Sequence, residues 1–347
     1  MNRPSDKMNR HPDKNSSCRY GLIGYPLGHS FSERYFSEKF SAESITDCEY
    51  AAYPLESIDR LPALIASQRL DGFNVTIPYK QQVMPYLDVL DPEAAAVGAV
   101  NCVAVKWKKT GGGQTGATDA GAENGTASAC AARREARSPW PAKAAGRGYM
   151  LTGYNTDVYG FKVSLLELLG DERPRALVLG TGGASKAVEH VLRSLGIGYI
   201  LVSRTRGEAG ENMAGVGDGT ASARNGQARR TGRRALAQHG EKTVLRSQPM
   251  PTAAQRITYA DVTGELMASN TLIINTTPLG THPNTEEAAP LPYQHLTAKN
   301  LLFDLVYNPP QTLFLRLGAE AGARTMNGYR MLVLQAERSW EIWRKNL

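Results

Sequence analysis

The sequence is poor in cysteine, and its few cysteines do not cluster. It has no Cys-x-x-Cys pair and no set of histidines close to a cysteine. The four cysteines are Cys18, Cys48, Cys102 and Cys130. This spacing predicts neither a metal site nor a disulfide framework, and reduced thiols in a cytoplasmic protein are the simplest interpretation.

Long apolar runs are also missing. Residues 1–18 are polar and contain a second methionine, Met8, as an alternative start, so we expect a disordered leader rather than a signal peptide. No later run is long and apolar enough to span a bilayer. The sequence therefore predicts a protein of the cytoplasm that does not enter a membrane.

An evenly basic surface is absent too, although the formal net charge is +7. Residues 1–18, 107–148 and 207–256 carry +2, +4 and +4, which leaves −3 on the rest of the chain. The two long segments are rich in Gly, Ala and Arg without an apolar period, so we expect disordered insertions, the first within a hairpin. Specific nucleic-acid binding is not expected, because the remaining chain offers no basic face.

What is present in residues 19–106 is an alternation of strand and helix patterns, which predicts a small α/β layer. Residues 72–77 alternate apolar and polar side chains, which indicates a strand with one apolar face that ends at Pro78. Lys80 follows and is either a solvated charge or a positioned acid/base. Helical segments are expected over Pro85–Leu90 and Pro92–Val97.

Other polar side chains stand at predicted helix starts. Ser30 and Ser32 precede or begin a helix over Glu33–Phe40, where they either cap it or direct two hydroxyls toward a carboxylate. Asp157 stands at the start of a helix over Val158–Leu169, so capping competes with catalysis as its role.

Residues 175–185 predict a buried strand, a glycine turn and a helix to about Leu195. This is the form of the first β-α turn of dinucleotide-binding folds, which receives a pyrophosphate. At the tip of the next strand, Arg204 and Arg206 replace the acidic residue that binds unphosphorylated ribose, which favours a 2′-phosphate and NADP. Alternatively, the two arginines simply begin the basic insertion.

Two later strands end in polar residues, at Asn275–Gly280 and Asp304–Tyr307. These ends would meet at the carboxyl edge of a sheet, where open α/β folds bind ligands. The chain closes with a helical pattern through Trp340 and Trp343, whose apolar stripe indicates core packing.

These motifs, and their order along the chain, resemble those of the shikimate dehydrogenases, which interconvert 3-dehydroshikimate and shikimate with NADP(H). The resemblance covers nearly everything outside the leader and the insertions. The matching stretches are Gly24–Ser32, Asn74–Lys80, Gly98–Asn101, Gly153–Asp157, Gly180–Ser185, Asn275–Gly280, Asp304–Tyr307 and Gly328–Gln335.

The resemblance implies a role for each matching site residue. Lys80 and Asp157 are the implied catalytic pair. The implied substrate residues are Ser30, Ser32 and Tyr307 at the carboxylate, and Thr76, Asn101 and Gln335 at the ring and its hydroxyls. The implied cofactor residues are Gly180, Thr181, Gly182, Gly183 and Ala184 at the pyrophosphate, Ser203, Arg204, Thr205 and Arg206 at the adenosine phosphate, and Leu305 and Gly328 at the nicotinamide. No metal is implied.

The chain departs from the family near the adenosine phosphate. Ser203 stands where the family often has Asn, and Gly207-Glu208 stands where a further basic residue is common. NADP preference is therefore less firmly predicted than the reaction. The alternatives are a quinate/shikimate dehydrogenase that also uses NAD and, from another class, a non-catalytic nucleotide-binding protein.

The resemblance also implies two α/β domains. The sequence does not determine the oligomeric state, for which a homodimer is one expectation. A substrate-binding domain would comprise 19–157 and 328–347, so that the C-terminal helix returns to the first domain. A Rossmann-like NADP-binding domain would comprise 158–327.

Overall fold

The computed structural model of the protein describes residues 17–28, 31–108, 147–205 and 255–346. The predictions for the leader, for Ser30, for Arg206 and for most of the two basic insertions fall outside these residues. Within the described ranges, no helix combines the length and the apolar character needed to cross a membrane.

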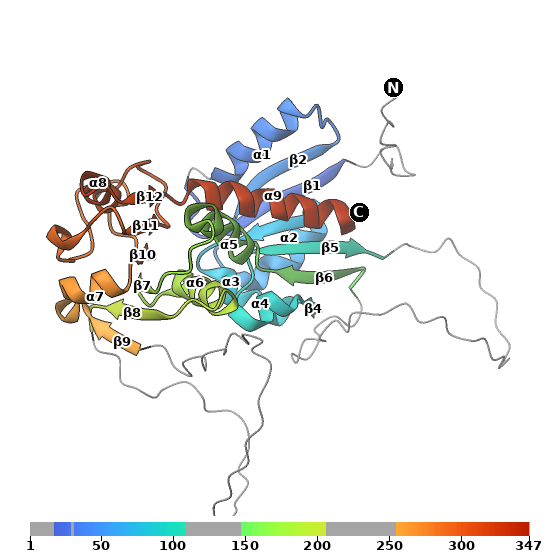
Figure 1. Cartoon of the computed structure of the whole chain (residues 1–347). Helices are drawn as coiled ribbons and strands as arrows, with labels where there is room; N and C mark the ends of the chain where they lie inside the picture. Colours follow the sequence, from blue (N-terminus) through green and yellow to red (C-terminus); the bar gives the residue numbers. More distant parts are fainter. Residues whose placement is uncertain (1–16, 29–30, 109–146, 206–254, 347) are drawn as a thin grey trace, which may run out of the picture.

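The described chain forms two sheets of six strands, one in each half of the molecule (Figure 1). The first sheet has the order β2-β1-β3-β5-β6-β4. Its strands are β1 (Cys18–Gly24), β2 (Cys48–Pro54), β3 (Gly72–Val75), β4 (Val89–Leu90), β5 (Cys102–Trp107) and β6 (Tyr149–Tyr154). β1 runs parallel to β2 and β3, whereas β5 runs antiparallel to β3 and β6. The small α/β layer expected from the sequence is confirmed.

β5 and β6 are the two strands of the hairpin that holds the first insertion. Trp107 pairs with Tyr149, and the Lys108 amide donates to the Gly148 carbonyl at 2.8 Å. The predicted hairpin is confirmed, but residues 107–108 and 147–148 belong to the folded part. The insertion is therefore shorter than the composition suggested.

The second sheet has the order β12-β11-β10-β7-β8-β9, and all of its pairings are parallel. Its strands are β7 (Ala176–Leu179), β8 (Tyr199–Ser203), β9 (Gln255–Thr258), β10 (Leu272–Asn275), β11 (Leu301–Asp304) and β12 (Arg324–Met326). Counted along the chain, this is the 3-2-1-4-5-6 order of doubly wound dinucleotide-binding sheets. The order reverses between β7 and β10, so the ligand crevice is expected at their carboxyl ends. Gln255 and Arg256, assigned to the second insertion from the sequence, belong to β9.

Helices connect the strands, together with short 3₁₀ turns. The helices are α1 (Phe31–Ala42), α2 (Leu61–Gln68), α3 (Tyr79–Gln82), α4 (Pro92–Val97), α5 (Thr156–Leu169), α6 (Gly183–Ser194), α7 (Gly264–Ser269), α8 (Leu313–Glu320) and α9 (Tyr329–Asn346). The 3₁₀ turns are Ile58–Arg60, Met84–Tyr86, Tyr259–Asp261 and Tyr293–His295.

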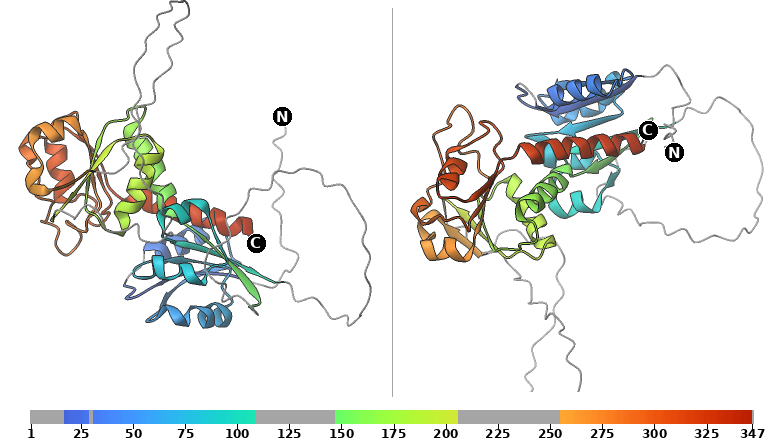
Figure 2. Two further views of the ribbon diagram at one scale, coloured as in Figure 1. Left: turned by 90° about the horizontal axis from the view of Figure 1, so that it is seen from below. Right: turned by 45° about the horizontal axis from the view of Figure 1, so that its top comes forward.

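Helix α9 leaves the second half and lies against the first sheet (Figure 2). Trp343 is 1% exposed and packs in a cluster with Tyr20, Phe36 and Trp340. Its indole Nε1 donates to the Val103 carbonyl at 3.0 Å. Burying a Trp side chain of about 200 Å² contributes about 5 kcal/mol before the loss of side-chain entropy. The predicted return of the C-terminal helix is confirmed, and its aromatic stripe belongs to the core.

Two expectations about local structure were wrong. Residues 85–90 do not form a helix, because Val89–Leu90 pairs with β6 as strand β4 and this pairing overrides local propensity. The strand over residues 72–77 ends at Val75, and Ile77 is 75% exposed instead of contributing to an apolar face. The chain turns there and begins α3 at Tyr79, which brings Lys80 onto one helical turn.

Candidate active site

A cavity of about 320 Å³ lies at the carboxyl ends of β1 and β3 and is lined by both halves of the chain. Its lining includes all the catalytic and substrate residues expected from the sequence that the structure describes. These residues are Ser32, Thr76, Lys80, Asn101, Asp157, Tyr307 and Gln335. The fold therefore brings together side chains that are separated by up to about 300 positions in the sequence.

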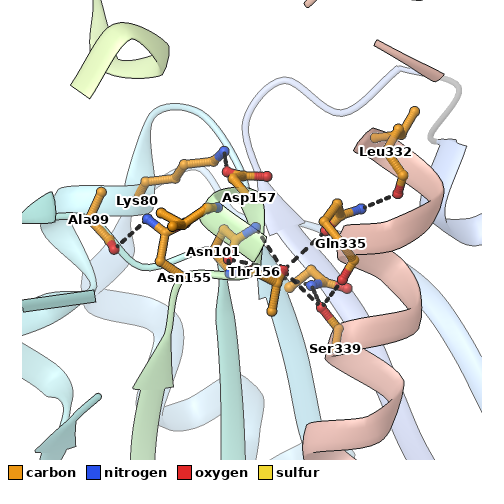
Figure 3. Close-up of polar contacts among 11 residues, drawn as sticks. Lys80, Ala99, Asn101, Asn155, Thr156, Asp157, Leu332, Gln335 and Ser339 are labelled. Carbon is orange, nitrogen blue, oxygen red and sulfur yellow. Dashed lines mark hydrogen bonds and ion pairs between the residues drawn. The ribbon is translucent and has the colours of Figure 1, made fainter. Parts of the chain in front are cut away.

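Lys80 and Asp157 form an ion pair in this cavity, with 2.6 Å between Lys80 Nζ and Asp157 Oδ2. The two side chains point toward each other from α3 and α5 (Figure 3). They are 35% and 21% exposed, so the pair remains open to a bound molecule. The cap of α5 is Asn155, whose Oδ1 accepts from the Val158 amide at 3.2 Å. Asp157 is therefore not needed as the cap.

Beside the ion pair, a buried hydrogen-bond network is centred on Thr156. Asn101 Oδ1 accepts from the Thr156 amide at 2.7 Å, and Asn101 Nδ2 donates to Thr156 Oγ1 at 3.1 Å. Thr156 Oγ1 also lies 3.3 Å from Gln335 Oε1 and 3.2 Å from Ser339 Oγ, both on α9 (Figure 3). The network fixes Asn101 and Gln335 relative to the helix that carries Asp157.

Ser339 and Thr156 were not identified as site residues from the sequence. Ser339 Oγ accepts from Asn74 Nδ2 at 2.9 Å and donates to the Gln335 carbonyl at 2.9 Å. Ser339 is fully buried, so it holds the neighbouring site residues in place through these hydrogen bonds. The available signal was its position four residues after Gln335, which places both on one face of a helix.

The described residues expected at the substrate carboxylate, Ser32 and Tyr307, line the same cavity. Ser32 is 9% exposed within the first turn of α1, which begins at Phe31, so Ser32 does not cap this helix. Tyr307 is 41% exposed, and its ring lies edge-on to Phe31 with 6.2 Å between centroids. The Thr76 amide donates to the Ile23 carbonyl at 2.9 Å, which holds Thr76 beside β1.

The glycine turn after β7 has the features needed for a pyrophosphate. Gly180 has a φ of +102°, and a Cβ there would lie 2.8 Å from Thr276 Oγ1. Among the described residues, nothing lies within 4 Å of a Cβ added at Gly182 or Gly183, and no side chain caps α6. The start of this helix therefore lies beside open space, at the positive end of the helix dipole. Thr181 lies in the same glycine turn, and Ala184 lies in the first turn of α6.

At the tip of β8, Ser203 Oγ donates to the Thr205 carbonyl at 2.6 Å. The Arg204 and Thr205 side chains are exposed there. Farther along the sheet edge, Gly328 lies against Leu305, because a Cβ at Gly328 would clash with the Leu305 carbonyl. The structure thus brings together the two residues expected at the nicotinamide.

A buried carboxyl group holds the loop that carries Leu305. Asp304, the last residue of β11, is fully buried and accepts from Asn275 Nδ2 at 2.9 Å, Thr312 Oγ1 at 2.6 Å and the Val306 amide at 3.0 Å. Burial raises the pKa of Asp304 to about 6, although the three hydrogen bonds oppose this increase.

Comparisons with known proteins agree with this architecture. A family model described as the shikimate dehydrogenase substrate binding domain matches residues 22–103. A curated shikimate dehydrogenase (NADP(+)) of Halothermothrix orenii is 32% identical over 339 residues, which cover 95% of this chain and 91% of that protein.

Solved structures agree as well. Shikimate dehydrogenase 1 of Peptoclostridium difficile aligns with a TM-score of 0.58 and 27% identity, over 94% of this chain and 92% of that one. A quinate dehydrogenase of Corynebacterium glutamicum in complex with NAD aligns with a TM-score of 0.63 and 20% identity, over 95% of this chain and 94% of that one. At 20% identity, the second alignment shows the fold alone.

Proposed function

Because the chain belongs to the shikimate dehydrogenase family, we propose that it catalyses the reversible, NADPH-dependent reduction of 3-dehydroshikimate to shikimate, a step toward the aromatic amino acids. The observation that most supports this activity is the 2.6 Å ion pair of Lys80 and Asp157 in the wall of a two-sided cavity. The same cavity is lined by hydroxyl and amide groups suited to a polyhydroxylated ring acid.

Lys80 is the proposed proton donor and acceptor. Reduction of a ketone requires a hydride on carbon and a proton on oxygen, and bound NADPH supplies only the hydride. The Lys80 ammonium can donate the proton to the developing alkoxide and take it back in the reverse direction. Asp157 stabilises the ammonium and aims it into the cavity through the ion pair.

The remaining cavity residues are proposed to orient the substrate. Ser30, Ser32 and Tyr307 would bind the carboxylate through their hydroxyl groups. Thr76, Asn101 and Gln335 would bind the ring hydroxyls. Asn101 Oδ1 contacts both the amide and the hydroxyl of Thr156, and Asn101 Nδ2 donates one hydrogen to that hydroxyl, which leaves the second amide hydrogen for a ligand.

NADP is the proposed cofactor, and the residues of the second half fit it. The uncapped start of α6 and the bare glycines offer amides to a pyrophosphate. The exposed Arg204 offers a cation to a 2′-phosphate, and Arg206 is the proposed second cation. Leu305 and Gly328 would contact the nicotinamide through their backbone.

We also propose a substrate-binding domain of residues 19–157 and 328–347 and an NADP-binding domain of residues 158–327. The packing of Trp343 against the first sheet supports the placement of 328–347 in the substrate-binding domain. A cytoplasmic location and a homodimer are further proposals. Light scattering coupled to size-exclusion chromatography tests the dimer.

The proposed role of Lys80 is tested by the Lys80→Met variant, assayed at the NADPH absorbance band with shikimate and NADP. Loss of a general acid/base lowers kcat by about 10²–10⁴-fold, whereas the Kd for shikimate should change little. Lys299→Met, at an exposed lysine of the second half, is the matched control and should retain full activity. Near-normal turnover of Lys80→Met would refute the role.

The same assay distinguishes the proposed shikimate dehydrogenase from a quinate/shikimate dehydrogenase that uses NAD. Comparison of kcat/KM for shikimate and quinate, each with NADP and NAD, should favour shikimate with NADP. A preference for quinate with NAD would assign the chain to the quinate branch instead.

A further inference from the structure

Two cysteines that are 30 positions apart in the sequence lie opposite each other at the start of the first sheet. Cys18 begins β1, Cys48 begins β2, and the two are direct partners in the parallel register. β2 is an edge strand of its sheet. Within the described residues, neither cysteine forms a disulfide, and both are only partly buried, whereas Cys102 is fully buried.

The backbone geometry suits a covalent bond between these two residues. Neighbouring strands lie about 4.8 Å apart, within the range of about 4.4–6.8 Å between Cα atoms that disulfides span. Both side chains pack against the same cluster around Trp340, so they project from the same face of the sheet. A disulfide can therefore form without a change of register.

The two thiols also differ in acidity. A hydrogen bond from Cys48 lowers the pKa of Cys18, an effect that partial burial and the carboxylates of Asp71 and Asp47 oppose. The same interaction, together with burial, raises the pKa of Cys48. Because the thiolate is the reactive form, Cys18 is suited to attack an oxidant. Oxidation of Cys18 removes the negative charge that helps to raise the pKa of Cys48, so Cys48 can then attack the oxidised Cys18 sulfur.

We propose that Cys18 and Cys48 form an oxidative modification site, at which a peroxide converts the two thiols into a disulfide. The Cys18 sulfur attacks one peroxide oxygen, the O–O bond breaks, and a sulfenic acid and one water form. The Cys48 sulfur then attacks the Cys18 sulfur, the S–S bond forms, and the hydroxyl group leaves as a second water. The peroxide takes up the two electrons and the two thiol protons, and a dithiol reductant reverses the modification.

The cross-link would close the segment that contains β1, α1 and β2. A covalent bond across such a loop restricts the unfolded chain, so the oxidised protein should unfold at a higher temperature. The active-site cavity begins at Leu22 and Pro26, near the other end of β1. The disulfide should therefore leave the substrate site unobstructed.

The experiment is peptide mapping of the full chain after treatment with hydrogen peroxide, alkylation of remaining thiols and digestion with trypsin. Cys18 then lies in peptide 15–19 and Cys48 in peptide 40–60, whereas Cys102 lies in 81–106 and Cys130 in 110–133. We expect 15–19 joined to 40–60, with the mass of two hydrogen atoms lost and recovered on reduction. Absence of this linkage, or a linkage to 81–106 or 110–133 in its place, would overturn the proposal.

Serine variants provide the matched controls. Cys18→Ser and Cys48→Ser should each lose the cross-link and the increase in Tm of several degrees, whereas Cys102→Ser should retain both. Activity toward shikimate should change by less than about twofold on oxidation, because the cavity is at the opposite strand end. An unchanged Tm in the cross-linked wild-type protein would refute the stabilising effect.

Discussion

Replacing Gly160 by Ala tests how closely α5 and α9 must pack to build the site. Gly160 lies on α5 at its contact with α9. A Cβ there would lie 2.5 Å from the Met331 carbonyl oxygen and 3.1 Å from the Gln335 amide nitrogen, whereas ordinary contacts begin at 3.4 Å. The backbone atoms cannot turn aside as a flexible side chain would, so the helices must separate by about 0.9 Å.

This separation should affect both stability and function. Overpacking typically costs about 1–3 kcal/mol, and the gain in helix propensity from Gly to Ala offsets about 1 kcal/mol. The net loss in the free energy of unfolding should therefore be about 1 kcal/mol. The contacts of Thr156 with Gln335 and Ser339 are already 3.3 and 3.2 Å long, so the shift would break them. Displacement of a positioned group by about 1 Å can reduce the rate about 10²-fold.

The measurements are a thermal melt and steady-state kinetics with shikimate and NADP. Gly160→Ala should lower kcat/KM far more than the loss of stability alone explains. Gly148→Ala is the control, since its added Cβ meets no atom of the described residues within 4 Å. If Gly160→Ala raised Tm and left kcat/KM unchanged, helix propensity would dominate and the packing argument would fail.

Two further variants probe buried polar groups. The pKa of Asp304 in the folded protein is about 6, above its ordinary value of 3.8, so the folded state holds the proton more tightly than the unfolded state. The free energy of unfolding should therefore fall by about 3 kcal/mol as the pH rises from about 4 to about 6. Asp304→Asn should flatten that dependence in urea titrations between pH 4 and 7, and an unchanged slope would contradict the assignment. Ser339→Ala removes one of two acceptors of Asn74 Nδ2, the other being the Asn101 carbonyl. This variant should raise the KM for shikimate severalfold and cost about 1–3 kcal/mol in stability. Ser339→Thr should restore part of both, and an unaltered KM would exclude a positioning role.

The sequence predicted those parts of the fold that depend on local pattern. The strand and glycine turn at 176–183 are defined by residues that are neighbours in the chain, and the structure confirms them. The exposure of Ile77 was not predictable from alternation, because the strand ends two residues earlier, at Val75. The Cys18–Cys48 pair was missed because strand register depends on which strands become neighbours, and sequence spacing does not encode this.

The site itself was predictable only through resemblance, since its contacts join distant segments. Lys80 and Asp157 are 77 positions apart, and Thr156 and Ser339 are 183 positions apart. No local pattern relates such residues, and loop entropy opposes their meeting until the core holds the elements in place. The network around Thr156 therefore became visible only with the packing of α5 on α9.

Helix α9 sets the spacing between the proposed cofactor and substrate contacts. The Gly328 carbonyl accepts from the Leu332 amide at 3.0 Å, so Gly328 is in the helical frame even though α9 begins at Tyr329. Gln335 follows seven residues later, about two turns and about 10 Å along the same face. Because Trp343 anchors the far end in the first sheet, one rigid element holds both contacts at this separation. A substitution that displaces α9 from the first sheet should therefore impair the positioning of both substrate and nicotinamide, whereas a substitution of Arg204 should affect cofactor binding alone.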